Sequence, residues 1–312
     1  MTRIQLLAAV IFLVLLALAV AAIAQVQVRR EGPSPRPFSR SEMAVPSSEL
    51  AMLPGGDVLL EVRVDGKGPY HFLLDTGASG GGRINQPLVD SLGLKVVGQV
   101  LAGDSTGKNR QTLSIVRAPS VTVGAATFSD VNLIARDLAV ASAGRNVSFD
   151  GVLGIELFQD YLLTLDFPAR RVRIEKGELP PADGREILDF ESWHGVARVQ
   201  VKVGDLAVTT DVDSGNLHGG FVLPASYLGK VALEGEPKVV GRRRTGFNEL
   251  EVKQATLKDP LQIGGLVLQH VTADFIDGLP HASFGQQLLA RFAVTIDQKN
   301  RRIRFQMPSQ AR

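Results

Sequence analysis

Cysteine is absent from this sequence of 312 residues, and the absence removes several classes of chemistry. Without thiols the chain forms no disulfide, no thiolate nucleophile, no cysteine-ligated zinc site, no iron–sulfur cluster and no lipoprotein anchor. The sequence also lacks an excess of one charge sign. It has 34 Lys and Arg and 32 Asp and Glu, so its net charge does not indicate nucleic-acid binding. The five histidines lack metal-ligand spacing. We therefore expect oxygen or imidazole chemistry with no metal, no cofactor and no nucleic-acid partner.

The N-terminal segment, residues 1–24, is almost entirely apolar after Arg3 and ends in the small-residue sequence AIA. This pattern is typical of an export signal. The apolar run approaches the roughly 20 residues that cross a bilayer, so an uncleaved membrane anchor formed by residues 4–24 is the alternative. Both alternatives place the rest of the chain outside the cytoplasm. Residues 25–48, rich in Pro, Ser and Arg, predict a linker.

The remaining sequence contains an internal repeat, which constrains the architecture before any single motif is interpreted. EVRVDGKGPYHFLLDTGAS, beginning at Glu61, resembles VQVKVGDLAVTTDVDSGN, beginning at Val199. Asp75 and Asp213 occupy the same place in the two copies, 138 positions apart. Later matching segments begin at Thr106 and Thr245, at Val121 and Leu261, and at Gly154 and Gly285. The sequence therefore predicts two related halves, residues 49–180 and 181–312.

The pattern of each half predicts a series of short strands separated by turns that contain Gly, Asp and Asn. Alternating segments include residues 58–64, 121–123 and 199–203. Helical patterning is confined to stretches such as residues 86–92. Because strands and helices do not alternate regularly, a doubly wound parallel sheet is disfavoured, and an all-β body of two lobes with short helices is predicted.

The repeated aspartates each follow a strand and precede a hydroxyl residue and a glycine, as Thr76-Gly77 and Ser214-Gly215. Glycine permits a sharp turn and close approach of the backbone. Two carboxylates presented a few ångströms apart cannot both ionise readily, so one keeps a proton. The pair then provides a general base that activates water and a general acid that protonates a leaving nitrogen.

Asp75-Thr76-Gly77-Ala78-Ser79 resembles the catalytic signature of retropepsin-like and pepsin-like aspartic proteases, and Asp213-Ser214-Gly215 resembles its second copy. The resemblance covers residues 51–307. It implies an acid-protease fold of two pseudo-twofold-related, barrel-like lobes and an aspartic endopeptidase with Asp75 and Asp213 as the catalytic dyad. It also implies that residues 152–154 and 283–285 thread beneath the catalytic turns.

The same resemblance implies a polypeptide substrate that binds extended between the lobes, beneath hairpin flaps. Candidate flap residues are Thr106, Gly107, Thr245 and Gly246, with solvated loops as the alternative. Resemblance to exported bacterial proteins predicts a periplasmic location, with the body either soluble or anchored to the inner membrane, and a substrate among periplasmic or membrane-protein segments. Because the repeat places both aspartates in one chain, a monomer with one active site is expected.

Asn216 departs from the resemblance, because that family usually carries a small or hydroxyl residue after the second glycine. Its amide could donate to Asp213 and favour the ionised form there, which would leave Asp75, beside Ala78, as the holder of the proton. Asn216 could equally crowd the site. The alternative function is therefore a catalytically inactive homologue that binds polypeptide in the cleft.

A serine hydrolase is the alternative hypothesis for the catalytic chemistry, because Gly77-Ala78-Ser79-Gly80-Gly81 satisfies the G-x-S-x-G pattern after a strand. That pattern requires strands and helices alternating around a parallel sheet, which this sequence does not predict. It also leaves the second Asp-Ser-Gly unexplained, so the aspartate pair is favoured.

Overall fold

The computed structural model describes residues 36–54, 57–103, 106, 110–143, 147–217, 219–244 and 249–308, all within one structural unit. The predicted signal or anchor lies outside the described residues. In the described part, no helix has the length and apolar character needed to cross a membrane.

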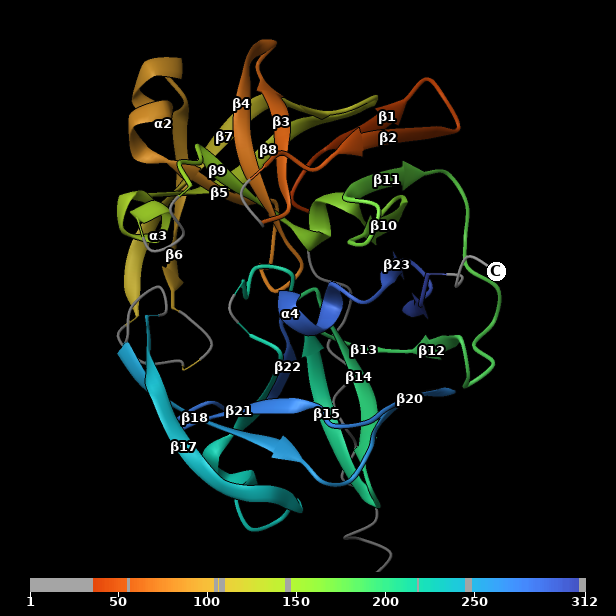
Figure 1. The fold of residues 1–312 in the computed structure, drawn as a ribbon. Coiled ribbons are helices and arrows are strands. Elements are labelled where there is room, and N and C mark those ends of the chain that lie inside the picture. The colour runs from red at the N-terminus through yellow and green to blue at the C-terminus, as the bar shows by residue number, and fades with distance from the viewer. Residues whose placement is uncertain are drawn as a thin grey trace, which may run out of the picture. The chain divides into compact units, whose positions relative to one another are not determined.

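The first lobe is built on an eight-stranded sheet (Figure 1). Its strands, in spatial order, are β1 (Arg40–Met43), β8 (Ala126–Arg136), β5 (Gly82–Asn85), β9 (Gly151–Gly154), β4 (Lys67–Asp75), β3 (Leu59–Val64), β7 (Gln111–Val123) and β6 (Lys95–Ala102). β7 pairs with both β3 and β8, so six of these strands close into a barrel. The short helices are α2 (Gln86–Leu92), α3 (Ala139–Ala143) and η1 (Ile155–Phe158).

The second lobe repeats this path in a ten-stranded sheet. Its spatial order is β17 (Leu233–Arg244), β18 (Glu249–Leu257), β21 (Thr272–Ile276), β16 (Phe221–Pro224), β22 (Ala282–Phe284), β15 (Leu206–Val212), β14 (Val196–Val203), β19 (Leu261–Ile263) and β20 (Leu266–Leu268), with β13 (Glu191–Trp193) paired to β14. The helices η2 (Ala225–Tyr227) and α4 (Gln286–Leu289) accompany it. The prediction of an all-β, two-lobed fold with short helices is confirmed.

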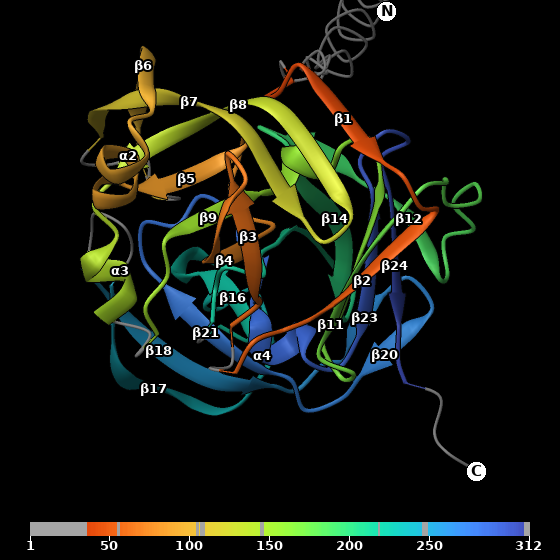
Figure 2. The ribbon, with the colours of Figure 1, turned by 90° about the horizontal axis from the view of Figure 1, so that it is seen from above.

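A third sheet joins the lobes, with strands from both halves side by side (Figure 2). Its order is β12 (Ile187–Asp189), β24 (Arg302–Gln306), β23 (Ala293–Asp297), β10 (Leu162–Asp166), β11 (Arg171–Glu175) and β2 (Ser47–Ala51). β10 and β23 are antiparallel, with Thr164 opposite Thr295 and their Oγ1 atoms 3.0 Å apart. The closing hairpins of the two halves therefore pair around a local twofold axis.

One strand, β1, lies in the region predicted to be a linker, residues 25–48, and a second strand, β2, begins there. β1 pairs with β8, and β2 pairs with β11, so Arg40–Met43 and Ser47–Ala51 belong to the folded body. Their partners are far away in the sequence, and the Ser-rich, Pro-interrupted pattern gives neither segment a clear strand periodicity. Distant pairing, rather than local propensity, makes them strands.

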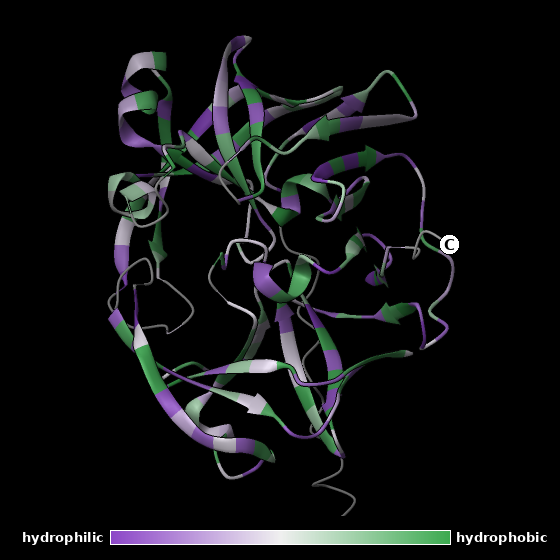
Figure 3. Cartoon of the chain, in the orientation of Figure 1, coloured by the Kyte–Doolittle hydropathy of each residue, from purple (hydrophilic) through white to green (hydrophobic). Residues whose placement is uncertain are grey.

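Alternation of polar and apolar residues along the strands builds the cores of both lobes (Figure 3). In β3 the side chains of Leu60, Val62 and Val64 are buried, while those of Glu61 and Arg63 face solvent. Successive side chains of a strand point to opposite faces, so this spacing puts one face in the core. The strand and helix segments predicted at residues 58–64, 121–123, 199–203 and 86–92 are confirmed.

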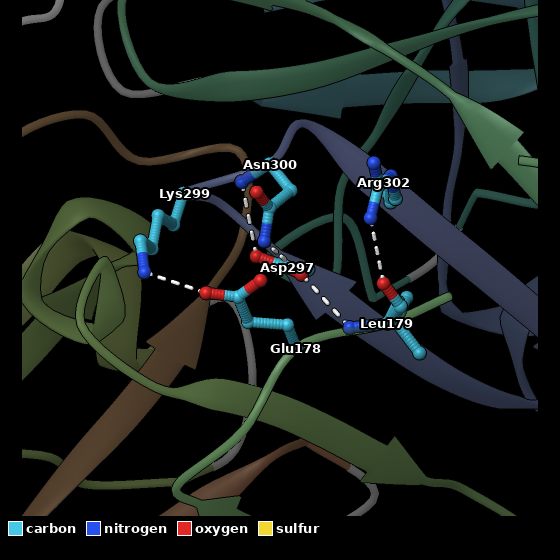
Figure 4. Close-up of polar contacts among 6 residues, drawn as sticks. All are labelled: Glu178, Leu179, Asp297, Lys299, Asn300 and Arg302. Carbon is cyan, nitrogen blue, oxygen red and sulfur yellow. Dashed lines mark hydrogen bonds and ion pairs between the residues drawn. The ribbon is translucent and has the colours of Figure 1, made fainter. Parts of the chain in front are cut away.

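The segment that connects the lobes is held against the turn after β23 (Figure 4). The buried carboxylate of Asp297 accepts hydrogen bonds from Leu179 N at 2.9 Å and from Asn300 Nδ2 at 2.9 Å. Arg302 Nη1 donates to Leu179 O at 2.7 Å, and Lys299 Nζ pairs with Glu178 at 2.6 Å. This network fixes the crossing between halves onto the shared sheet.

Candidate active site

Each repeated aspartate lies at the end of a strand that has a parallel neighbour. Asp75 ends β4, which runs parallel to β9 with Asp75 opposite Gly154. Asp213 follows β15, which runs parallel to β22 with Val212 opposite Phe284. β9 and β22 cover residues 151–154 and 282–284, so the two segments expected beneath the catalytic turns lie beside the strands that carry the aspartates.

The turns that follow the aspartates hold each carboxylate by its own backbone. Gly77 N donates to Asp75 Oδ1 at 2.8 Å, and Gly215 N donates to Asp213 Oδ1 at 2.9 Å. A backbone donor to a carboxylate both orients the side chain and stabilises its charge. The two halves present their carboxylates in the same local geometry.

The hydroxyl residues of the two turns bond reciprocally across the lobe boundary. Thr76 N donates to Ser214 Oγ at 3.0 Å, and Ser214 N donates to Thr76 Oγ1 at 2.9 Å. The same hydroxyls donate onward to carbonyls at the ends of the opposite strands, Thr76 Oγ1 to Val212 O at 2.7 Å and Ser214 Oγ to Leu74 O at 2.9 Å. These four buried bonds fasten one turn to the other.

Glycine is required after each hydroxyl residue because the opposite aspartate occupies the space of a side chain. A Cβ on Gly77 would lie 2.5 Å from Asp213 Oδ1, and one on Gly215 would lie closer still to the Asp75 carboxyl group. Real Cβ atoms essentially never approach so near. Each carboxyl group therefore packs on the backbone of the other lobe, which brings Asp75 and Asp213 together in one site.

A cavity of about 1180 Å³ opens over the two aspartates and is bordered by both lobes. The hairpins β6–β7 and β17–β18 approach it from the same side of the molecule (Figure 1), through residues that include Gly103, Thr106, Gly241 and Arg242. Thr106 thus borders the cavity, as a flap residue should. The other candidate flap residues, Gly107, Thr245 and Gly246, lie outside the described residues.

Residues 60–157, which include the first aspartate turn, match the model of a family described as aspartyl protease. This match supports an aspartyl protease of the retropepsin-like kind. The matched segment is less than half of the chain, and the second aspartate lies outside it. No curated protein sequence matches the chain.

Electrostatics separate the two carboxyl groups of this site. Desolvation at the cavity floor raises the pKa of Asp213 well above its ordinary value, and the charge of Asp75, a hydrogen bond with it, and Asp211 act in the same direction. The hydrogen bond from Gly215 opposes them. Asp213 is therefore the better holder of the shared proton.

The hydrogen bond that would favour a proton on Asp75 does not occur in the described structure. No hydrogen bond joins the Asn216 side chain to Asp213 among the described residues; the amide group instead packs against Gly219. The backbone of Asn216 is regular, since its carbonyl accepts from Gln286 N at 2.9 Å. Gln286 Nε2 also donates to Ser214 O at 2.6 Å, which secures the second turn.

Two charged residues near the first turn escaped sequence analysis. The carboxylate of Glu156 accepts a hydrogen bond from Gly80 N and is itself buried. Arg83, on β5, donates to Ser79 O at 3.3 Å and borders the cavity. Burial lowers the pKa of Arg83, while the charge of Asp75 raises it. Neither residue has a counterpart of the same charge in the second half of the repeat, so the repeat gave no signal for them.

The polar strand before Asp213 has a structural explanation. Arg198 Nε lies 2.6 Å from Asp211 Oδ1, and Gln200 Nε2 donates to Thr209 Oγ1 at 2.8 Å, both across the β14–β15 pairing. Polar groups on a sheet are tolerated when a neighbouring strand supplies their partners. These polar side chains therefore have partners within the sheet.

The fold does not support the serine hydrolase hypothesis. The all-β sheets exclude the alternation of helices and parallel strands that positions such a nucleophile. Ser79 does border the cavity, but no hydrogen bond joins its hydroxyl to a histidine among the described residues. In the same part of the chain, no group of three or more His, Asp or Glu residues could hold a metal ion.

Proposed function

We propose that this aspartyl protease is an endopeptidase that hydrolyses extended polypeptide with water activated by Asp75 and Asp213. The observation that supports the dyad most strongly is the reciprocal bonding of Thr76 and Ser214, because it fixes two carboxyl groups against each other at the floor of one cavity. Paired carboxylates with separated proton affinities are suited to general acid–base hydrolysis.

In this mechanism the ionised Asp75 takes a proton from a water molecule as its oxygen forms a bond to the carbonyl carbon. Asp213, whose pKa is raised, donates its proton to the carbonyl oxygen. The resulting tetrahedral diol then collapses: the carbon–nitrogen bond breaks, the leaving nitrogen receives the proton held by Asp75, and a hydroxyl of the diol returns its proton to Asp213 as the carboxyl product forms. The products are a carboxylic acid and an amine, and the dyad returns to its singly protonated state.

We further propose that one chain forms one site. The pairing of β10 with β23 is symmetric about Thr164 and Thr295, and the aspartate turns interlock within the same chain. A second molecule is therefore unnecessary for completing the dyad. An inactive homologue that only binds polypeptide is the competing function, and cleavage separates the two.

Asp75→Asn and Asp213→Asn test the dyad, since each exchange is nearly isosteric. Each variant should lose cleavage of a peptide library while keeping the fold, and a mixture of the two should stay inactive at all concentrations. Restored activity on mixing would show pairing between chains. Retained activity in either variant would refute the dyad, and a wild-type protein that binds peptides without cutting them would identify the inactive homologue.

Inhibition gives a second test of the same proposal. A transition-state mimic with a hydroxyl between the carboxyl groups should inhibit, because such groups bind more tightly than substrate. Chelators and serine-directed reagents should not. Covalent labelling of Ser79 would reverse the assignment.

We also propose that the body lies in the periplasm, after cleavage of residues 1–24 or anchored by residues 4–24. The support is the apolar N-terminal pattern alone. A reporter active only in the cytoplasm, fused after Arg312, should be silent. A strong signal would refute export.

A further inference from the structure

Trp193 is the only tryptophan of the chain, and it stands at the edge of the catalytic cavity rather than in a core. Its side chain is 45% exposed, which makes it the one aromatic residue among the large exposed apolar side chains of the described structure. A large aromatic ring left open to a cavity exposes apolar area that a ligand could cover.

The ring is held in place on three sides. The Arg198 guanidinium carbon lies 4.5 Å from the ring centroid, and Arg198 is in turn fixed by its ion pair with Asp211. The rings of His194 and His281 approach at 5.0 Å and 6.1 Å between centroids. Burial and the charge of Arg198 lower the pKa of His281, against the charge of Asp211, and so favour the neutral ring. A cation–π contact and two edge-on rings leave Trp193 little freedom to turn.

The hairpin that carries Trp193 is also anchored to both halves of the molecule. Trp193 pairs with Val196 across the turn at His194 and Gly195. Gln298 Nε2 donates to Gly195 O at 2.9 Å, and Gly195 has no room for a side chain because Glu156 of the first lobe packs against it. The ring is therefore a rigid part of the cavity wall.

The distance from this ring to the dyad can be estimated from a chain of contacts. Asp211 lies in β15 and Asp213 directly follows that strand, so two residues of extended backbone, about 7 Å, separate them. Asp211 contacts Arg198, and Arg198 contacts Trp193. The ring thus lies within roughly 15 Å of Asp213, a distance spanned by about four or five residues of an extended chain at about 3.3 Å each.

We propose that Trp193 forms an aromatic subsite, which binds a Phe, Tyr or Trp side chain of the polypeptide substrate about three to five residues from the cleaved bond. This inference rests on the proposed function, since it takes the cavity to be the polypeptide cleft. One face of the ring is covered by Arg198, so the substrate ring contacts the part of Trp193 that stays exposed.

Binding can be measured without cleavage because Trp193 is the sole tryptophan. Peptides of about ten residues span about 33 Å when extended, roughly twice the distance from the dyad to the ring. A set is made in which one Phe moves along an otherwise fixed sequence, with Ala at the same position as the matched control. Titration into the Asp213→Asn variant should change the tryptophan emission, and the Phe peptide of the correct register should bind roughly tenfold more tightly than its Ala control.

Cleavage by the active protein gives the second readout. The Phe-over-Ala ratio of kcat/KM should be roughly tenfold in the wild type, close to one in Trp193→Ala and largely retained in Trp193→Phe. Val267→Ala is the control, because Val267 is 56% exposed on β20 and does not border the cavity. That variant should keep the wild-type ratio.

The outcomes separate this subsite from the dyad. Emission that discriminates Phe from Ala peptides while the wild type cuts nothing would support the subsite and refute the endopeptidase. Cleavage whose aromatic preference survives Trp193→Ala, or shows no preference in any register, would overturn the subsite alone. An emission change with oligosaccharides but not with peptides would overturn it in favour of sugar binding.

Discussion

The two lobes follow the same strand path but differ in how continuously they follow it. In the first lobe β7 and β8 are long unbroken strands that close the barrel. In the second lobe the equivalent path is divided into β18 and β19, and into β20 and β21. Pro260 stands directly before β19, and proline lacks the donor that a continuous ladder requires. The second lobe is therefore the more irregular version of the same fold.

Near the boundary between the lobes the difference disappears. The aspartate turns exchange equivalent hydrogen bonds, and the β10–β23 register is symmetric. Elements at the boundary must match the equivalent elements of the other half, whereas strands far from it need only fill their own lobe. Symmetry is thus kept where a mismatch would separate the carboxyl groups.

The largest effect is expected from adding one carbon at either glycine of the aspartate turns. Gly77→Ala and Gly215→Ala would each push on the carboxyl group of the other lobe. Because a displacement of about 1 Å can cost about 100-fold in rate, cleavage should fall at least about 100-fold in both. Gly66→Ala is the control, since a Cβ there meets nothing within 4 Å although its φ of +72° adds some strain. Normal activity in only one of the turn variants would show that the lobes contribute unequally.

Thr76→Val and Ser214→Ala should lower the free energy of unfolding by about 2–3 kcal/mol each, because each leaves buried partners unpaired. Urea unfolding at one pH measures both. Thr76→Ser keeps the hydroxyl and should recover most of the loss. Losses that differ by more than about 1 kcal/mol would contradict the equivalence of the two turns.

Asp213→Asn should stabilise the protein at neutral pH. The folded-state pKa of Asp213 is raised, so the stability that its proton gives is complete below the unfolded pKa and is lost as pH rises through the folded pKa. Asn is uncharged at every pH. The difference in free energy of unfolding between the variant and the wild type should therefore close as pH falls towards 4. Unfolding curves between about pH 4 and 8 test this, with the exposed Asp277→Asn as control. A stability difference that widens at low pH would mean that folding lowers the pKa of Asp213.

The smallest effect is expected at the shared sheet. The Thr164 and Thr295 hydroxyls bond each other, so a double-mutant cycle to Ala should give a coupling of about 1 kcal/mol. Cleavage should change little, because neither side chain borders the cavity. A coupling near zero would show that the hydroxyl pair adds nothing to stability and that backbone pairing alone holds β10 against β23.

Much of this arrangement could be predicted from local sequence. The two Asp-hydroxyl-Gly turns, the strands that precede them and the two-lobed all-β fold follow from the repeat and from alternation. The strands β1 and β2 could not be found in this way, because their partners are more than 80 positions distant. Arg83, Glu156 and Trp193 were missed for a related reason: none is matched in the other half, and each matters through what it faces in space.

Sequence alone therefore determined where the two candidate aspartate turns lie, since a repeated turn motif needs only short-range spacing to be visible. Tertiary structure decided how the two carboxyl groups differ. Desolvation and the neighbouring charges of Asp75 and Asp211 together raise the pKa of Asp213. Such effects depend on distances across the lobe boundary, and no spacing along the chain records them.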